Sequence, residues 1–262
     1  MNEPKNDEIW EAIRQEAERD AQSEPMLASF LYAVVLNHKR FEDALGFHLA
    51  NKLGCPTLTA IALRDLFDQA YSEDASLGVA ARADIRAVYE RDPACKQYSM
   101  PLLYFKGFHA IQSYRIAHYL WEQGRGSLAL FMQSRISEVF GVDIHPAARI
   151  GRGILIDHAT SVVVGETAVV EDNVSLLHEV TLGGTGKESG DRHPKIRKGV
   201  LICAGAKLLG NIEVGEGAKI GAGSVVLDSV PAHSTAVGVP AKVVGKPLVE
   251  QPALEMDTRS SV

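Results

Sequence analysis

Residues 196–226 read IRKGVL-ICAGAK-LLGNIE-VGEGAK-IGAGSV-V, and they decide the fold of the second half of the chain. Every sixth residue of this stretch is aliphatic, from Ile196 to Val226. A period of six matches neither the turn of an α-helix nor the alternation of a strand. It is typical of a coil with three short flat sides, where one aliphatic side chain per side points into a narrow core. Stacked coils would then pair strand on strand in parallel.

The same series extends towards the N-terminus. Its earlier members are Ile144, Ile150, Ile156, Val164, Val170, Leu176 and Leu182, with two extra residues between Ile156 and Val164. Glycine often follows the aliphatic position, as in Val214-Gly215, and relieves backbone strain at the turns. The segment 183–195 breaks the series and is polar, charged and rich in glycine. We therefore expect a solenoid over residues 141–246 with one projecting loop at 183–195.

The first 140 residues have a different composition. All 17 aromatic residues lie at or before Phe140, whereas 17 of the 23 glycines follow it. From Leu103 to Trp121 the apolar residues recur at spacings of three and four, which is typical of a helix with one buried face. Segments with the same character are 8–19, 26–37, 41–52, 59–70, 80–91 and 128–140.

The sequence therefore predicts an α+β protein of three parts. A helical bundle over residues 1–140 precedes the solenoid, and a flexible tail over residues 247–262 follows it. The tail is predicted to be flexible because its composition resembles that of disordered segments.

Composition excludes several classes of protein. The chain has 262 residues and a net charge of −6, whereas nucleic-acid binding needs a positive surface. It has no apolar run near the roughly 20 residues that span a bilayer, and its N-terminus does not resemble a secretory signal. Three widely separated cysteines suit a reducing compartment and form no zinc-binding cluster. We expect a cytoplasmic protein with no metal, no membrane contact and no nucleic-acid partner.

One candidate for chemistry is the pair Asp157-His158. His158 is the third residue of a hexad that begins with the inward-facing Ile156, so its imidazole is expected at or near the surface. A histidine held by a carboxylate is the usual arrangement for a general base. An imidazole ordinarily has a pKa near 6.5, which suits a base that works at neutral pH. His178 lies where it could face the same cleft, but nothing local argues for a role.

A second candidate is the pair Arg192-His193 in the projecting loop. A guanidinium can hold a carboxylate through two parallel hydrogen bonds, and a neighbouring histidine can orient a polar group or move a proton. The alternative is that the loop is a surface insertion without chemistry.

Seven motifs spread over nearly the whole chain carry a family resemblance. They are RDPA (91–94), DIHP (143–146), DHAT (157–160), VGET (164–167), TLGGTGK (181–187), GDRHPKI (190–196) and GVPA (238–241). In these motifs the chain resembles the serine O-acetyltransferases of the bacterial cysteine pathway, which belong to the hexapeptide-repeat acyltransferases. The resemblance implies a left-handed parallel β-helix with active sites between neighbouring prisms. It also implies trimers that join in pairs through the helical domains.

The resemblance further implies transfer of acetyl from acetyl-CoA to the hydroxyl of L-serine, with inhibition by L-cysteine at the serine site. His158 matches the family's general base and Asp143 the carboxylate that supports it. Because no activated nucleophile is visible, we expect direct transfer without an acetyl-enzyme. The matches to serine-binding residues are Asp92, Pro93, Asp157, Arg192 and His193. The residues expected to contact coenzyme A are Gly184, Thr185, Ala204, Lys219, Ala222 and Lys242.

The C-terminus suggests one protein partner. Members of this family often end in an isoleucine that inserts into cysteine synthase (O-acetylserine sulfhydrylase). This chain ends in Val262 instead. Since one buried methylene is worth about 0.8 kcal/mol, the resemblance implies a weaker form of this partnership.

Other functions remain compatible with the sequence. A related acyltransferase would use a different hydroxyl acceptor, such as a sugar or an antibiotic. A gamma-type carbonic anhydrase has the same fold, but this chain lacks the closely spaced histidine pair of that family. A non-catalytic β-helix that only docks partners is the third alternative, and the two histidine-containing pairs count against it.

Overall fold

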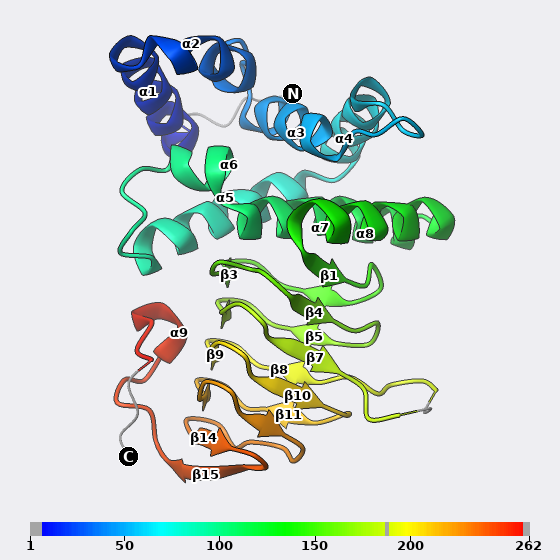
Figure 1. The fold of residues 1–262 in the computed structure, drawn as a ribbon, viewed down its shortest axis with the longest axis vertical. Coiled ribbons are helices and arrows are strands. Elements are labelled where there is room, and N and C mark those ends of the chain that lie inside the picture. The colour runs from blue at the N-terminus through cyan, green and yellow to red at the C-terminus, as the bar shows by residue number, and fades with distance from the viewer. Residues whose placement is uncertain (1–6, 187–188, 259–262) are drawn as a thin grey trace.

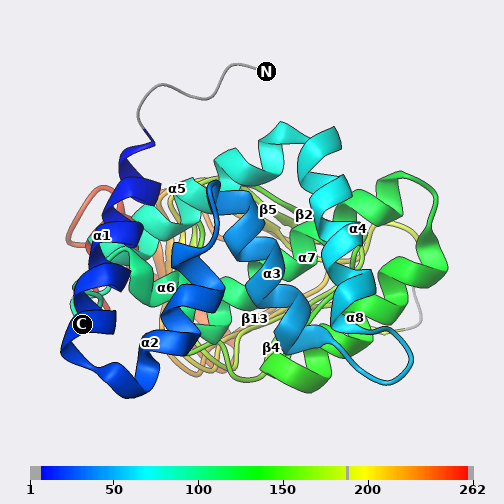
Figure 2. The same cartoon turned by 90° about the horizontal axis from the view of Figure 1, so that it is seen from above.

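The computed structural model of the chain describes residues 7–186 and 189–258. Helices cover one end of a β-solenoid, as Figure 1 shows from the side and Figure 2 from above. Helices α5, α7 and α8 lie next to the solenoid, and α1 to α4 lie beyond them. The helices are α1 (Glu8–Ser23), α2 (Pro25–Leu31), the π-helical η1 (Tyr32–Leu36), α3 (Phe41–Leu53), α4 (Ala60–Glu73), α5 (Ala75–Arg91), α6 (Ser99–Tyr104), α7 (Lys106–Glu122), α8 (Gly126–Phe140) and α9 (Pro252–Glu255).

Local sequence explains several helix ends. Asp7 caps α1 by accepting a hydrogen bond from the Trp10 amide at 3.2 Å, and Asp74 caps α5 in the same way. Gly141 adopts a left-handed φ of 67° directly after α8, a conformation that favours glycine. The predicted helical region is confirmed, since each predicted segment is helical. The short helix α6 is one that the apolar pattern does not predict.

The solenoid begins directly after Gly141. Its strands are β1 (Val142–Ile144), β2 (Arg149–Ile150), β3 (Leu155–Ile156), β4 (Val162–Val164), β5 (Val169–Val170), β6 (Ser175–Leu176), β7 (Thr181–Gly183), β8 (Lys195–Ile196), β9 (Leu201–Ile202), β10 (Lys207–Leu209), β11 (Glu213–Val214), β12 (Lys219–Ile220), β13 (Val225–Val226), β14 (Thr235–Gly238) and β15 (Ala241–Gly245).

The strands form three sheets that turn in sequence order around a common core. One sheet has the order β1-β4-β7-β10-β13, a second β2-β5-β8-β11, and a third β3-β6-β9-β12-β14-β15. All pairs are parallel except β14 with β15. The register pairs Ile144 with Val164 and Ile156 with Leu176, so residues of the six-residue series stack on one another. These residues are buried except for Ile150, which is partly exposed, and the predicted solenoid is thereby confirmed.

Two edges of the solenoid matter for function. At the loop edge the chain passes from the β1 sheet to the β2 sheet, and the described residues of this edge are 145–148, 165–168, 184–186, 189–194 and 210–212. At the histidine edge it passes from the β3 sheet back to the β1 sheet, through residues 157–161, 177–180, 203–206 and 221–224. The β1 sheet separates the two edges by about three residues of strand, or roughly 10 Å.

A buried ion pair joins the helical layer to the solenoid. Asp84 on α5 is fully buried and accepts hydrogen bonds from Arg115 Nη2 at 2.7 Å and Gln112 Nε2 at 2.8 Å, both on α7. Its other carboxylate oxygen accepts from the Ile154 amide of the solenoid at 2.8 Å. Arg115 also donates to the Gly151 carbonyl at 2.7 Å. One carboxylate therefore holds α5, α7 and a solenoid corner together.

The C-terminal segment differs from the expected flexible tail. Helix α9 lies beside α5 and β9, with Ala253 fully buried and its carbonyl accepting from Ser175 Oγ at 2.9 Å (Figure 1). Ala253 and Met256 pack against Leu201 and Cys203. Composition did not predict this packing, because it does not reveal a few apolar residues that fit one surface. Val262 lies outside the described residues.

A pair of histidines is buried in the helical layer. The rings of His48 on α3 and His109 on α7 have centroids 5.1 Å apart. Burial, with a smaller effect of Lys52, lowers the pKa of His48 to about 4. Burial, with a smaller effect of His48, lowers the pKa of His109 to about 3. Both imidazoles are therefore neutral in the folded protein at neutral pH.

We expect this pair to make the fold sensitive to acid. An unfolded histidine takes up a proton near pH 6.5, whereas these two do so only near pH 4 and 3 in the fold. The free energy of unfolding should therefore fall as the pH drops below 6.5, with His48 contributing about 2 kcal/mol of loss by pH 5. Urea unfolding at pH 7 and pH 5 measures this loss. The variant His48→Leu should lose less stability between these two pH values than the wild type, and equal losses would contradict the assignment.

Candidate active site

His158 lies on the histidine edge, directly after β3. Its side chain is 77% exposed, and its Nε2 lies 3.9 Å from Oδ1 of Asp157. Its ring packs edge-on against the ring of His178, with centroids 5.9 Å apart and an interplanar angle of 77°. The imidazole therefore points out of the solenoid core, where a solute can reach it and give it a proton.

The backbone around His158 is unusual. His158, Ala159 and Ser161 all have φ between 53° and 61°, the left-handed region that non-glycine residues rarely adopt. Ile156 and Val164 are the inward-facing residues on either side, and the two extra residues between them are accommodated in this corner. Strained backbone of this kind is common at functional sites, where the surrounding structure holds a side chain in a defined direction.

Helix α7 supports the same corner. Lys106 Nζ donates a hydrogen bond to Thr160 Oγ1, two residues after His158. A Cβ on Gly107 would lie 2.0 Å from the Ile156 carbonyl oxygen, so only glycine allows α7 to approach the end of β3 this closely. Contacts with α7 thus fix the backbone on both sides of the candidate base.

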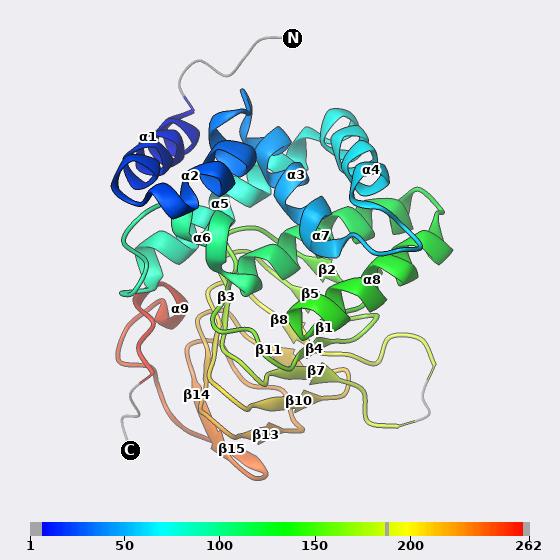
Figure 3. The same cartoon turned by 45° about the horizontal axis from the view of Figure 1, so that its top comes forward.

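The loop edge carries Arg192 and Glu166. Residues 184–186 and 189–194 leave the solenoid on the side away from α9 (Figure 3). Arg192 Nη2 donates to Glu166 Oε2 at 2.6 Å, and this bond lowers the pKa of the Glu166 carboxyl. The guanidinium also donates to the Gly190 carbonyl at 3.1 Å, which leaves further donors for a carboxylate.

His193 has a defined tautomer. Its Nδ1 accepts from the Thr167 amide at 3.2 Å, so the proton of the neutral ring lies on Nε2. Burial lowers the pKa of His193, with a further contribution from Arg192, and keeps the ring neutral. A Cβ on Gly165 would lie 2.1 Å from Nε2, so glycine at that position makes room for the ring. His193 is thereby built as a neutral hydrogen-bond donor.

Within one chain the two candidate pairs do not meet. Asp157 and His158 lie on the histidine edge, and Arg192 and His193 lie on the loop edge, with the β1 sheet between them. Asp143 lies on β1, and its Oδ1 accepts from Gln133 Nε2 at 2.7 Å. The hydrogen bonds and ion pairs of residues 7–186 and 189–258 do not join Asp143 to His158.

Comparison with known proteins identifies the family. A family model described as serine acetyltransferase, N-terminal, matches residues 9–113, and a bacterial transferase hexapeptide model of six repeats matches residues 193–228. A serine acetyltransferase of Salmonella typhimurium is 61% identical over 249 residues, which cover 95% of this chain and 91% of that protein. The chain belongs to the serine acetyltransferase family. It is an acyltransferase that uses acetyl-CoA.

Solved structures of this family agree with the fold. The serine acetyltransferase of Vibrio cholerae superposes with a TM-score of 0.95 at 58% identity, covering 96% of this chain and 97% of that one. One serine acetyltransferase was solved with cysteine, with a TM-score of 0.95, 58% identity and coverage of 96% and 98%. The enzyme of Brucella abortus was solved with coenzyme A, with a TM-score of 0.91, 56% identity and coverage of 92% and 96%.

The remaining expected serine-binding residues of the enzyme lie at the end of α5. Asp92 is its C-cap, and its Oδ1 accepts from the Ala94 amide at 2.8 Å, while Pro93 is exposed. The preceding Arg91 is buried and donates to Ser175 Oγ at 3.2 Å, which attaches this end of the helix to the solenoid.

The expected coenzyme A contacts of the enzyme divide between the two edges. Gly184 and Thr185 lie at the loop edge, and Ala204 and Ala222 lie at the histidine edge. Lys242 is exposed on β15. Lys219 is only 2% exposed, and its contact with coenzyme A stays a prediction. Burial raises the pKa of the Cys203 thiol, and the ammonium group of Lys219 partly offsets this effect.

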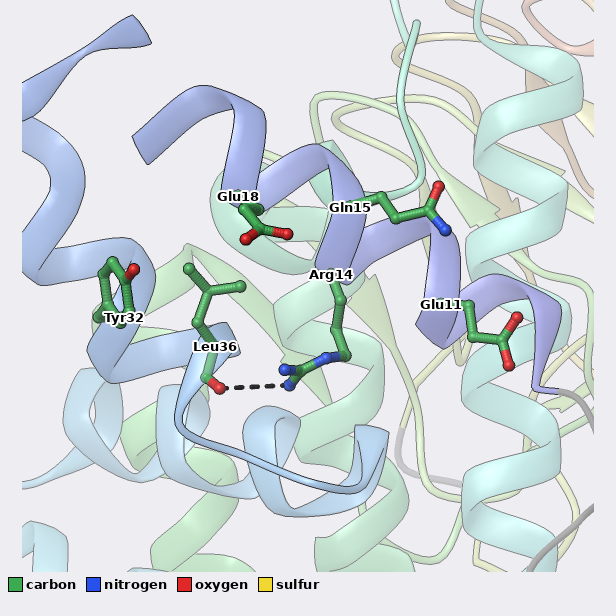
Figure 4. A pocket seen from close by; sticks show the side chains of 6 residues that line it. All are labelled: Glu11, Arg14, Gln15, Glu18, Tyr32 and Leu36. Carbon is green, nitrogen blue, oxygen red and sulfur yellow. Dashed lines mark hydrogen bonds between the residues drawn. The ribbon is translucent and has the colours of Figure 1, made fainter. Parts of the chain in front are cut away.

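A pocket of the enzyme lies apart from both edges. It has a volume of about 350 Å³ and lies between α1 and η1 (Figure 4). There Arg14 donates from Nη1 to the Leu36 carbonyl at 3.3 Å, and no predicted site residue contributes to the lining. No helix among the described residues is long and apolar enough to cross a membrane, and no group of at least three His, Cys, Asp or Glu residues among them could hold a metal ion.

Three residues near the candidate site of the enzyme have contacts that were not predicted. Glu166 and Thr167 hold Arg192 and His193, and their position in the VGET motif gives no hint of these bonds. The ring of His178 packs edge-on against that of His158, and the sequence contained a signal for this contact. Ile156 and Leu176 pair in register on neighbouring strands. His158 comes two residues after Ile156 and His178 two residues after Leu176, so the two histidines lie on adjacent coils.

Proposed function

We propose that the enzyme transfers acetyl from acetyl-CoA to the hydroxyl of L-serine, giving O-acetyl-L-serine and CoA, with His158 as the general base. This reaction is the first step of cysteine biosynthesis. The observation that carries the assignment of the base is the exposed imidazole of His158 beside Asp157 in a chain of this family. A serine acetyltransferase from soybean, 63% identical with a TM-score of 0.89 and coverage of 90% and 97%, was solved with serine.

The proposed reaction needs no acetyl-enzyme. His158 takes the proton of the serine hydroxyl as the oxygen attacks the thioester carbon. The carbonyl electron pair moves to oxygen and gives a tetrahedral oxyanion. Collapse of this intermediate breaks the carbon–sulfur bond, and the protonated imidazole returns its proton to the leaving thiolate. Every proton taken by His158 is thus given back within one turnover.

We propose that the serine site forms between two chains. The histidine edge of one solenoid would supply His158 and Asp157, and the end of α5 would supply Asp92, for the base and the ammonium group of serine. The loop edge of a neighbour would supply Arg192 and His193 for the carboxylate. An interface between two different edges is heterologous, and three such contacts close into a ring. A trimer, with two trimers joined through the helical layers, is the assembly that we propose.

Release of CoA thiol tests the function directly. We expect thiol release from acetyl-CoA to require L-serine, and to be reduced by L-cysteine in competition with serine. Homoserine and aminoglycosides serve as alternative acceptors in parallel assays. Faster turnover with one of these acceptors would support a different acyltransferase, and no turnover with any acceptor would support a scaffold without catalysis.

Mixed trimers test the site between chains. If His158 and Arg192 act in one site from different chains, mixing His158→Ala and Arg192→Ala chains should restore about one quarter of the sites by random assembly. The chains are unfolded together, refolded and assayed at a serine concentration below the wild-type KM. Each variant refolded alone is the control. Activity no higher than the sum of the controls would mean that both residues act within one chain.

The C-terminal segment leads to a second proposal on partners. We propose that cysteine synthase binds the chain end, including Val262, and that it does so more weakly than it binds a family member that ends in isoleucine. Pull-down of cysteine synthase by the full chain and by a chain ending at residue 258 tests this proposal.

A further inference from the structure

We infer that Lys195 is a positioning residue for the carboxylate of L-serine, because its ammonium group holds the backbone on both sides of Arg192. The inference rests on the proposed function, in which Arg192 binds that carboxylate. It assigns a function to the last residue of the projecting loop, which takes no part in the proposed proton transfer or in the expected contacts with coenzyme A.

Lys195 lies where the loop rejoins the solenoid. It is the first residue of β8, and its backbone pairs in register with Val169 of β5 and Glu213 of β11. Its amide donates to the Ile212 carbonyl at 2.8 Å. The next residue, Ile196, is buried in the core, so the side chain of Lys195 lies on the outer face of the β2 sheet. Strands on both sides therefore fix the position of this lysine.

The ammonium group of Lys195 has an acceptor for each of its three N–H donors. Nζ donates to Oδ1 of Asp191 at 2.6 Å and to the His193 carbonyl at 2.6 Å. The third acceptor is the Thr167 carbonyl of the adjacent coil, at 3.1 Å. The bond to Asp191 lowers the pKa of that carboxyl, so Asp191 is charged at neutral pH. These bonds leave the lysine side chain only 15% exposed, and its charge holds protein groups together.

Arg192 lies between the two loop residues that this ammonium group contacts, Asp191 and His193. Its own amide donates to Thr167 Oγ1 at 3.0 Å, so the chain is held at three successive residues. The guanidinium then reaches Glu166, whose Oε2 accepts from Nη2 at 2.6 Å. A guanidinium binds a carboxylate through two parallel bonds only when its plane is correctly placed, and a displacement of about 1 Å can cost about 100-fold in rate. Loss of the Lys195 contacts should therefore weaken recognition of the carboxylate.

Comparison of two acceptors separates positioning from general stability. L-serinamide keeps the amine and the hydroxyl of L-serine and lacks its carboxylate. In Lys195→Met we expect kcat/KM for L-serine to fall about 10- to 100-fold, while kcat/KM for L-serinamide and KM for acetyl-CoA stay within about threefold of wild type. Lys198→Met is the matched control, since Lys198 is an exposed lysine of the same coil, and it should change none of these values.

A double mutant tests whether Lys195 acts through Arg192. Arg192→Ala removes the guanidinium that Lys195 would position. Adding Lys195→Met to this variant should therefore lower kcat/KM for L-serine by less than about threefold, because residues that act as a unit are not additive. If Lys195→Met caused its full loss in this background as well, Lys195 would act independently of Arg192 and the inference would be wrong.

Asp191→Ala keeps the inference testable if Lys195→Met does not fold. The Asp191 side chain is 56% exposed, so its removal should leave the fold intact while the ammonium group loses one of its three acceptors. We expect a smaller loss than in Lys195→Met, again confined to L-serine. Thermal unfolding and gel filtration of each variant show whether the fold and assembly are retained.

Two kinetic results would overturn the inference. Equal losses with L-serine and L-serinamide would assign Lys195 to the general stability of the site. Unchanged kinetics in folded Lys195→Met would mean that Arg192 keeps its position without the lysine. A wild-type enzyme without serine-dependent thiol release would instead contradict the proposed function, and a wild-type enzyme equally active on both acceptors would contradict the proposed binding of the carboxylate by Arg192.

Discussion

Replacing His158 by alanine should lower kcat for acetyl transfer about 10²- to 10⁴-fold, the usual contribution of a positioned general base. The serine hydroxyl is scarcely ionised at neutral pH, and without the imidazole the site loses the proposed acceptor for its proton. Binding of acetyl-CoA should change little, because the side chain is 77% exposed and has few packing partners to lose. Steady-state kinetics and equilibrium binding of CoA measure the two effects separately.

The backbone at position 158 requires a second variant. Alanine is poorly suited to a φ of 53°, whereas asparagine tolerates this region. His158→Asn should therefore keep wild-type stability while losing the same activity. His233 offers a matched control, since it is also exposed and has a φ of 50°. If His233→Asn and His158→Asn were equally active, the assignment of the base would be wrong.

Replacing Asp84 by alanine should lower the free energy of unfolding by about 3–5 kcal/mol, because the change leaves the buried Arg115 without its counter-charge. The Ile154 amide and the Gln112 side chain lose their acceptor at the same time. Such a loss is a large share of the free energy of unfolding, which is roughly 5–15 kcal/mol for a folded protein. Urea unfolding followed by circular dichroism measures it.

An exposed ion pair gives the matched control for this prediction. Arg135 and Glu138 form a salt bridge on α8 in which the Glu138 side chain is 69% exposed. Glu138→Ala should cost less than about 1 kcal/mol, because solvent screens an exposed pair. A loss in Asp84→Ala no larger than that of the control would mean that solvent reaches Asp84 and that the junction does not depend on it.

The solenoid was predictable because its signal is periodic and local. Each side of each coil buries one aliphatic residue. The series from Ile144 to Val226 therefore contains the same evidence for the fold many times. The boundary at Gly141 was equally clear, since the disappearance of aromatic residues reflects the narrow core. The docking of α9 was not predictable, because it depends on the fit of Ala253 and Met256 to a surface built from distant segments.

The candidate site was predictable in its residues and not in its geometry. The pairs Asp157-His158 and Arg192-His193 were recognisable, but their separation by the β1 sheet depends on which corner each occupies. The burial of Lys219 was missed because a lysine beside a solenoid position is normally solvated. His178 was expected near the same cleft but without a role, because its contact is with His158 of the adjacent coil and not with its neighbours in sequence.

The strand register fixes the distance between residues on different coils of the histidine edge. His158 and Ala222 follow β3 and β12, which are three strand steps apart in the same sheet. At about 4.8 Å per step these two residues lie roughly 14 Å apart along the solenoid axis. A solenoid cannot stretch without breaking its ladders, so this span changes only when a whole rung is inserted or deleted. Deleting one rung between them would bring the two residues about 5 Å closer.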